Sequence, residues 1–274
     1  MQLIDGKALA EEIKLEVRKE IIEGKLHPNL AVILVGNDPA SELYIKMKEA
    51  ACKMVGIEFH KYLLPETADQ AEVLQTIDFL NRDETINAIL LQLPLPKQLD
   101  ENEIISRIDP AKDVDGFHPA NIEKLLSGHP RLIPGLALGV LKLLEKTGEP
   151  LQDKSAVVIG WNPVFTRPMG YLLSKVAREV ITVKPDDDRI VEVCRQADII
   201  ITAAGVLNFI TSPMIKDGAI IIDIGINKTP DNKTAGDVDL SAAQEHASYI
   251  TPVPGGVGPV TVAMLLFNTL VLVK

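Results

Sequence analysis

The first part of the chain shows the residue spacing of a helix. Leu9, Ile13, Val17 and Ile21 recur at every fourth position, and Asp5 precedes them where a helix cap would stand. This pattern predicts an amphipathic helix with one buried face.

A continuous apolar run over residues 30–35 follows and ends at Gly36. Such a run is typical of a strand that is buried on both faces. Asp38 and Pro39 then supply a cap and a first-turn proline for a second helix. Its apolar stripe is expected to consist of Leu43, Met47, Ala50 and Met54.

The alternation continues beyond this helix. Strands are expected at 57–63 and 88–93, with a helix between them that carries Val73, Ile77 and Leu80. Strands that alternate with helices form parallel sheets covered by helices on both faces. The sequence therefore predicts the α/β fold class.

Residues 95–134 interrupt this rhythm, because they are rich in Pro, Gly and Asp and offer only a short helix at 103–107. We expect a connection between two domains within this segment. The apolar segment 257–273 contains Pro259 and Asn268 and is expected to form a buried terminal helix rather than a membrane span. Between them lies a second α/β set, with helices at 136–145 and 168–178 and strands at 156–159, 180–183, 198–202 and 219–224.

Composition narrows the function classes. The 274 residues carry a net charge of −10 and no run of Lys or Arg, so nucleic acid and membranes are not expected partners. Cys52 and Cys194 stand far apart without neighbours at metal-ligand spacing, which is typical of a reducing compartment. The N-terminus lacks the apolar core of a signal peptide. We therefore expect a soluble, cytoplasmic protein of two domains.

Tyr44 and Lys48 lie four residues apart and share one face of the second predicted helix. A lysine beside a phenol in a partly closed cleft can transfer protons, because desolvation lowers the lysine pKa. Gln92 ends an apolar strand, where α/β sheets bind ligands, and it can pair with a substrate or orient Lys48. Tyr44 and Lys48 can equally lie on a solvated helix face, and Gln92 can equally hydrogen-bond to loop backbone. The spacing does not distinguish these alternatives from a functional site.

Asp113 and Asp115 stand next to Gly116. A carboxylate can accept two hydrogen bonds from an aminopyrimidine edge, and it can equally cap a turn. His118 has no second histidine or carboxylate cluster at ligand spacing, so no metal is expected. The segment 252–259 places three glycines among three prolines, where backbone can approach a flat ligand or simply make a sharp connection.

These segments together closely resemble the bifunctional methylenetetrahydrofolate dehydrogenase/cyclohydrolase family, over nearly the whole chain. The resemblance implies a folate-binding catalytic α/β domain at 1–120, on which a last helix at 258–274 packs back, and a Rossmann-like NAD(P)-binding domain at 121–257. The matching segments are VGNDPASELYIKMKEAACKMVGI (35–57), LLQLPLP (90–96), DPAKDVDGFHPANI (109–122), IIDIGINK (221–228), AGDVD (235–239) and YITPVPGGVGPVTVAMLLFNTL (249–270).

The resemblance also implies a role for each matching position. Lys48 corresponds to the proton-transfer residue of the cyclohydrolase step, in which water adds to the methenyl carbon of 5,10-methenyltetrahydrofolate. Tyr44 then places the folate ring, Gln92 holds and tunes the lysine, and Asp115 anchors the pterin. A homodimer is a further expectation. Besides Tyr44, Gln92 and Asp115, the expected substrate-binding positions are Leu93, Pro254, Gly255, Gly256, Val257, Gly258 and Pro259.

The dinucleotide side departs from the family pattern at its first turn. The family has Gly-Arg-Ser and a later glycine, whereas this chain has Gly160 followed by Trp161 and Asn162, with Thr166 in place of the later glycine. A threonine side chain is expected to impede the close approach that a glycine allows. The expected cofactor-binding positions are Gly160, Trp161, Asn162, Arg167 and Ile226.

Two further departures lie nearby in the predicted domain. Carboxylates at 186–188 replace a His-Ser pair and would repel a 2′-phosphate, with Lys184 and Arg189 as a partial offset. Residues 134–138 read Pro-Gly-Leu-Ala-Leu where the family has Pro-Cys-Thr-Pro. We therefore expect a cyclohydrolase whose NADP-dependent dehydrogenase is weak or lost. The alternatives are a fully bifunctional enzyme that uses NADP or NAD, and a non-catalytic folate-binding protein on the same fold.

Overall fold

The computed structural model describes residues 1–274, apart from the side chain of Ala40. The chain folds into two compact units, and each is assembled from two separate stretches. Unit 1 contains Met1–Ala10 and Leu136–Thr261, and unit 2 contains Glu11–Gly135 and Val262–Lys274. The functional boundary expected between residues 120 and 121 stays a prediction.

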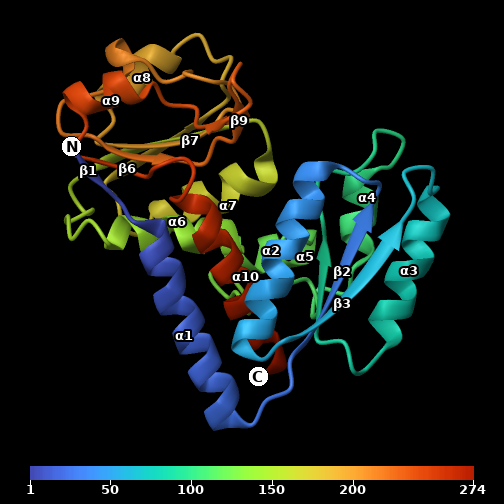
Figure 1. The fold of residues 1–274 in the computed structure, drawn as a ribbon. Helices are drawn as coiled ribbons and strands as arrows, with labels where there is room; N and C mark the ends of the chain where they lie inside the picture. Colours follow the sequence, from blue (N-terminus) through green and yellow to red (C-terminus); the bar gives the residue numbers. More distant parts are fainter. The chain divides into compact units, whose positions relative to one another are not determined.

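Unit 2 contains a three-stranded parallel sheet in which β2 lies between β3 and β4 (Figure 1). The apolar runs explain this order, because every residue of β2 after Asn29 is buried, as is every residue of β4. The elements are α1 (Gly6–Gly24), which begins in unit 1, β2 (Asn29–Val35), α2 (Pro39–Val55), β3 (Glu58–Leu64), α3 (Gln70–Arg82), β4 (Ala88–Leu91), α4 (Glu101–Arg107) and α5 (Pro119–Leu126).

Helix α3 covers one face of this sheet, as its spacing predicts. Ile77 and Leu80 of α3 are fully buried and belong to one apolar cluster with Ala31, Ile33 and Val35 of β2. These three strand positions alternate along the chain and therefore point to the same face. Burying an isoleucine or leucine side chain contributes about 1.5–3 kcal/mol, so this cluster fixes which face of the sheet α3 occupies.

Helix α2 begins as predicted, with the Asp38 side chain accepting a hydrogen bond from the Ser41 backbone N–H. The expected apolar stripe is wrong, because Leu43 and Met47 are 59% and 45% exposed. The helix instead buries the face that carries Ile45 and Cys52, and it contacts β3. Apolar residues stand on both faces of α2, and the sheet selects the face with the shorter and branched side chains.

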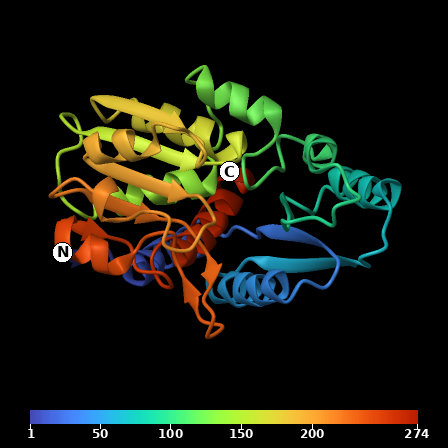
Figure 2. The same ribbon diagram turned by 90° about the horizontal axis from the view of Figure 1, so that it is seen from above.

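Unit 1 is built around a six-stranded sheet, and all of its paired strands are parallel (Figure 2). Strand β5 comes first in the second half of the chain, and its neighbours β6 and β7 lie on opposite sides of it. The strand order therefore reverses between β5 and β7, which is the position where such sheets bind ligands. In spatial order the strands are β1 (Gln2–Leu3), β11 (Tyr249–Ile250), β8 (Ile220–Asp223), β7 (Ile199–Ala203), β5 (Ser155–Gly160) and β6 (Glu179–Val183).

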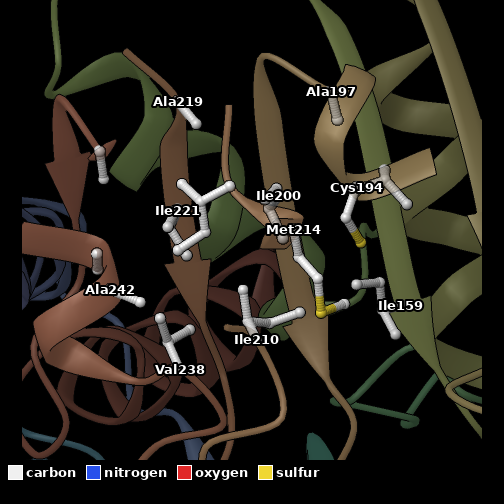
Figure 3. Packing of buried hydrophobic residues seen from close by; sticks show 14 of the residues in the cluster. Ile159, Cys194, Ala197, Ile200, Ile210, Met214, Ala219, Ile221, Val238 and Ala242 are labelled. Carbon is white, nitrogen blue, oxygen red and sulfur yellow. The ribbon is translucent and has the colours of Figure 1, made fainter. Parts of the chain in front are cut away.

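One face of this sheet is covered by short helices and a turn. Figure 3 shows Met214 beside Ile210, with its sulfur directed toward Ile159 and Cys194, and all four side chains are buried. The remaining elements of the unit are α6 (Gly135–Glu145), α7 (Pro163–Leu173), α8 (Ile190–Gln196), η1 (Ser212–Met214), β9 (Asn227–Lys228), β10 (Thr234–Ala235) and α9 (Leu240–His246).

Helix α7 begins at Pro163 and not at Pro168, which corrects the predicted range of 168–178. The Asn162 side chain caps the helix by accepting a hydrogen bond of 2.9 Å from the Val164 backbone N–H. Pro163 then occupies the first turn, where its missing N–H costs nothing. Thr166 consequently lies inside the helix and not in the turn that precedes it.

The last helix, α10 (Val257–Val273), has the predicted range. Its buried Asn268 side chain donates hydrogen bonds to the carbonyl oxygens of Val114 and Ile133, at 3.0 and 3.1 Å. An amide can therefore stand in an apolar helix because it has partners. Within the described residues, no helix combines the length and the apolarity that a membrane span requires.

Candidate active site

Lys48 and Gln92 lie on segments that follow two neighbouring strands of unit 2. Lys48 lies on α2, which follows β2, and Gln92 directly follows β4, which pairs with β2. The Lys48 Nζ atom donates a hydrogen bond of 2.8 Å to Gln92 Oε1. The Gln92 Nε2 atom donates to the Leu93 carbonyl oxygen at 2.7 Å. The loop backbone thus determines which end of the amide faces the lysine. Gln92 therefore both bonds to loop backbone and orients Lys48, as the two interpretations of the sequence had it.

The charges of this site are strongly affected by burial. Burial lowers the pKa of Lys48, and the nearby charge of Asp115 acts against that change. Burial also raises the pKa of Asp115 to about 7, with Lys48 acting in the opposite direction. Both groups can therefore exchange protons closer to neutral pH than they would in water. Shifts of this kind are typical of groups that take part in chemistry.

Asp113 and Asp115 have different environments, although the sequence could not distinguish them. The buried Asp113 carboxylate accepts hydrogen bonds from the backbone N–H groups of Gly116 and His118 and from the Asn121 amide, at 2.8–3.1 Å. It is the carboxylate that builds the turn. Asp115 is half-buried, and its charge acts on Lys48.

Tyr44 and Cys52 lie one turn before and one turn after Lys48 on α2. Burial raises the pKa of the Tyr44 phenol, and it raises the pKa of the Cys52 thiol to about 12. A fully buried, neutral thiol keeps water away from one side of the lysine stem and so adds to its desolvation. Sequence reasoning missed Cys52, although its four-residue spacing from Lys48 was a usable signal.

The glycine-rich segment at 254–259 belongs to unit 1 and runs from the loop after β11 into the first turn of α10. A Cβ atom on Gly256 would lie 2.6 Å from the Pro252 carbonyl oxygen, and one on Gly6 would lie 1.8 Å from the Gly256 carbonyl oxygen. Gly255 has a φ of +109°, which favours glycine. Packing within unit 1 therefore explains these glycines, and the folate contacts expected of the loop stay a prediction.

The turn after β5 is closely packed in unit 1. A Cβ atom on Gly160 would lie 3.0 Å from Cγ2 of Thr166, which is itself buried. Thr166 thus packs from α7 against the end of β5 and does not stand in the turn. The indole Nε1 of Trp161 donates a hydrogen bond of 3.1 Å to the Ala204 carbonyl oxygen, which follows β7. The turn spans the point at which the strand order reverses.

One of the three carboxylates after β6 is paired. The Arg189 guanidinium contacts both oxygens of Asp187, at 2.9 and 3.0 Å, and the Arg189 backbone N–H adds a third hydrogen bond. These bonds lower the pKa of Asp187 to about 2. The negative charge of this turn is therefore smaller than its three aspartates suggest. Arg167 and Ile226, the remaining expected cofactor positions, are exposed in the same unit.

Two family models together match nearly the whole chain. Residues 4–115 match the tetrahydrofolate dehydrogenase/cyclohydrolase catalytic domain, and residues 134–274 match the NAD(P)-binding domain of the same family. The chain belongs to this family. The resemblance inferred from the sequence and the predicted two-domain α/β class are thereby confirmed.

Individual tetrahydrofolate dehydrogenase/cyclohydrolase proteins match over nearly their full length. The bifunctional protein FolD of Nitratiruptor sp. is 47% identical over 274 residues, covering 98% of this chain and 97% of that protein. The crystal structure of the bifunctional enzyme FolD from Campylobacter jejuni is 42% identical, with a TM-score of 0.94 over 100% of this chain and 99% of that one. The enzyme from Trypanosoma brucei, solved with NADP and an inhibitor, is 34% identical, with a TM-score of 0.93 and coverage of 99% and 97%.

These matches favour the fully bifunctional alternative over a weak or lost dehydrogenase. The NAD(P)-binding model extends over all three departures that prompted the weaker expectation. Two of those departures also have a physical explanation. Thr166 lies in a helix and packs against Gly160, and Asp187 is neutralised in part by Arg189. At 134–138 the structure offers no such explanation.

Proposed function

We propose that this chain is a bifunctional methylenetetrahydrofolate dehydrogenase and methenyltetrahydrofolate cyclohydrolase. Membership of the family supports both activities, and relatives matched over nearly their full length are named as bifunctional proteins. The single observation that carries the cyclohydrolase is the hydrogen bond between Lys48 and Gln92, which joins a desolvated lysine to a fixed amide.

Lys48 is the proposed proton-transfer residue of the cyclohydrolase. A lowered pKa gives Lys48 a larger neutral fraction, so its amine can take a proton from the water that adds to the methenyl carbon. The resulting ammonium can give this proton to the ring nitrogen as its bond to the former methenyl carbon breaks, while the remaining hydroxyl proton leaves to water and the carbonyl group of the 10-formyl product forms. Gln92 Oε1 accepts a hydrogen bond from either form of the lysine and keeps Nζ in place.

Substrate binding is assigned to groups around this lysine. Asp115 in its ionised form can accept two hydrogen bonds from the aminopyrimidine edge of the pterin. Tyr44, one turn from Lys48, presents a neutral phenol that can pack against the folate ring. Leu93, next to Gln92, is proposed to supply a backbone contact to the folate. The folate contacts expected of residues 254–259 in unit 1 stay a prediction from the family resemblance.

NADP is the proposed dinucleotide. The turn after β5 fits a dinucleotide, because Gly160 has no room for a side chain and the turn ends at a capped helix of eleven residues. Bound at this turn, NADP would supply the hydride acceptor for oxidation of the methylene carbon. The residues proposed to hold it are Gly160, Trp161, Asn162, Arg167 and Ile226, and the NADP in the related Trypanosoma brucei structure supports the choice of dinucleotide.

Two assays on the purified protein test this proposal. One follows hydrolysis of methenyltetrahydrofolate, and the other follows oxidation of methylenetetrahydrofolate with NADP and, in a parallel series, with NAD. We expect both reactions, and faster oxidation with NADP than with NAD. Hydrolysis without oxidation by either dinucleotide would restore the cyclohydrolase-only interpretation. Folate binding without either reaction would support the non-catalytic one.

We also propose that the protein works in the cytoplasm as a homodimer. Both statements rest on the family resemblance, and the first also on a cysteine usage that is typical of a reducing compartment. Light scattering on the purified protein is expected to give about twice the mass of one chain, and a monomer would contradict the second statement. Cell fractionation tests the first.

A further inference from the structure

Asp237 is a fully buried carboxylate outside the proton-transfer site. Its Oδ2 atom accepts hydrogen bonds from Thr202 Oγ1 and from the backbone N–H groups of Ala204 and Gly205, at 3.0, 2.7 and 3.3 Å. Its Oδ1 atom accepts from the Val206 N–H at 3.1 Å and from Asn227 Nδ2 at 2.9 Å. Every partner is a donor, which suits an ionised carboxylate.

Three of these donors are successive backbone N–H groups of one loop. Residues 204–206 directly follow β7 and stand at its carboxyl end, beside the turn that follows β5. A loop whose consecutive N–H groups all point at one buried carboxylate has its conformation determined by that carboxylate. Gly205, with a φ of +68°, provides the left-handed residue that this curvature requires.

Asp237 is itself held in place by a second carboxylate. Asp223, at the end of β8, accepts hydrogen bonds from the backbone N–H groups of Asp237 and Val238, both at 3.0 Å. A Cβ atom on Gly225 would lie 2.1 Å from Asp237 Oδ1, and one on Gly236 would lie 1.9 Å from Asp223 Oδ2. The two glycines therefore make room for two interlocked carboxylates.

The other side of the loop is joined to Trp161. The N–H of Ala204 points at Asp237, and the carbonyl oxygen of the same residue accepts the indole hydrogen bond of Trp161. The indole thus reaches from the end of β5 to the end of β7, across the point where the strand order reverses. It remains 50% exposed, so part of the ring is available to a ligand.

We propose that Asp237 is a positioning residue of the dinucleotide site, which holds the 204–206 loop so that the Trp161 indole contacts the bound dinucleotide. This inference rests on the proposed dehydrogenase function. An aromatic ring held by a hydrogen bond at its edge offers its face for stacking, and a purine or a nicotinamide is a suitable partner. Trp161 is then a direct contact, and Asp237 acts through the loop.

Intrinsic fluorescence tests this arrangement, because Trp161 is the single tryptophan of the chain. Asp237→Asn preserves the shape but turns one acceptor oxygen into a donor that faces other donors. We expect a changed Trp161 emission in the free protein and a dinucleotide Kd raised about tenfold or more by calorimetry. Titrations run well above pH 6 keep Asp223 ionised, since burial raises its pKa to about 6. The matched control is Asp239→Asn, because asparagine caps α9 as well as aspartate does.

Variants of Trp161 test the contact even where Asp237→Asn does not fold. Trp161→Ala is expected to weaken dinucleotide binding about tenfold, and Trp161→Phe, which keeps a ring but loses the indole N–H, is expected to lie between it and the wild type. Wild-type affinity in both variants would overturn the contact. Unchanged emission and affinity in Asp237→Asn would overturn the positioning role. If the wild-type protein bound neither NADP nor NAD, the dehydrogenase proposal would fail, and this inference with it.

Discussion

The chain has two polar centres, Lys48 with Asp115 in unit 2 and Asp237 in unit 1, and their charged groups have different environments. In unit 2, Lys48 and Asp115 each favour the charged form of the other, yet burial still lowers the pKa of the lysine and raises that of Asp115 to about 7. In unit 1, Asp237 is fully buried and accepts hydrogen bonds from five donors. The first centre can exchange protons near neutral pH, whereas the second is a carboxylate whose hydrogen bonds fix the conformation of a loop.

The difference follows from where the partners come from. Lys48 is held by one side chain, Gln92, so its environment depends on a few rotatable groups. Asp237 accepts most of its hydrogen bonds from the backbone of the 204–206 loop, and these bonds in turn fix the conformation of that loop. A centre anchored by side chains can serve chemistry, whereas a centre anchored by backbone determines shape. Substitutions at Lys48 and Gln92 should therefore change rates and pH profiles, and substitution of Asp237 should change dinucleotide affinity.

The largest effect is expected at Lys48. Lys48→Met should slow methenyltetrahydrofolate hydrolysis by about 10²–10⁴-fold, because a general acid–base contribution of that size is lost. Folding and most of the affinity for a folate analogue should remain, as judged by circular dichroism and titration. Lys46→Met, an exposed lysine on the same helix, is the matched control. Near-normal turnover in a folded Lys48→Met protein would remove the proposed mechanism.

Asp115→Ala is expected to weaken binding of a folate analogue by about 1.5–3 kcal/mol, the cost of a charged hydrogen bond. Because the ionised form is the acceptor, wild-type affinity should rise as the pH increases through about 7, and the variant should lose this dependence. Asp113→Ala should instead lower the thermal stability, since that carboxylate builds the turn. Unchanged affinity in Asp115→Ala would show that it does not anchor the pterin.

Gln92→Glu tests how the amide tunes the lysine. A carboxylate in place of the amide should raise the pKa of Lys48, because an opposite charge stabilises the ammonium form. We expect hydrolysis at neutral pH to fall about tenfold and the pH–rate profile to move toward higher pH. Gln75→Glu, at an exposed position of α3, adds the same charge away from the lysine. A slower reaction with an unmoved profile would mean that Gln92 acts only through geometry.

Long, strongly periodic elements were predictable from the sequence, and orientations within them were not. The range of α10 follows from its continuous apolar run, and the buried face of α3 follows from its apolar spacing. The buried face of α2 did not, because Leu43 and Ile45 belong to two competing stripes and only contact with β3 selects one. The start of α7 was misplaced because Pro163 and Pro168 both suit a first turn. The Asn162 cap decides between them.

The candidate sites show the same limit. Tyr44 and Lys48 share a helix face by spacing alone, but the hydrogen bond to Gln92 depends on the pairing of β2 with β4. Asp237 lies in the matching segment 235–239, but its role could not be predicted, because its backbone donors lie more than thirty residues earlier in the chain. Helices of seven or eight residues such as α5, α8 and α9 gave too few turns for a periodic pattern. Contacts between distant segments are what spacing cannot supply.

The smallest effect is expected at the turn after β6, which belongs to the dinucleotide side of the chain. Arg189 neutralises Asp187 in part, so Arg189→Ala should leave a more negative turn beside the proposed adenosine end of the dinucleotide. NADP carries an extra phosphate, and we expect its affinity to fall about two- to threefold while that of NAD changes less, since exposed ion pairs are screened by solvent and salt. Arg195→Ala, on the exposed face of α8, is the control, and hydrolysis at Lys48 should not respond to either change. Equal losses for NADP and NAD would place the 2′-phosphate away from this turn.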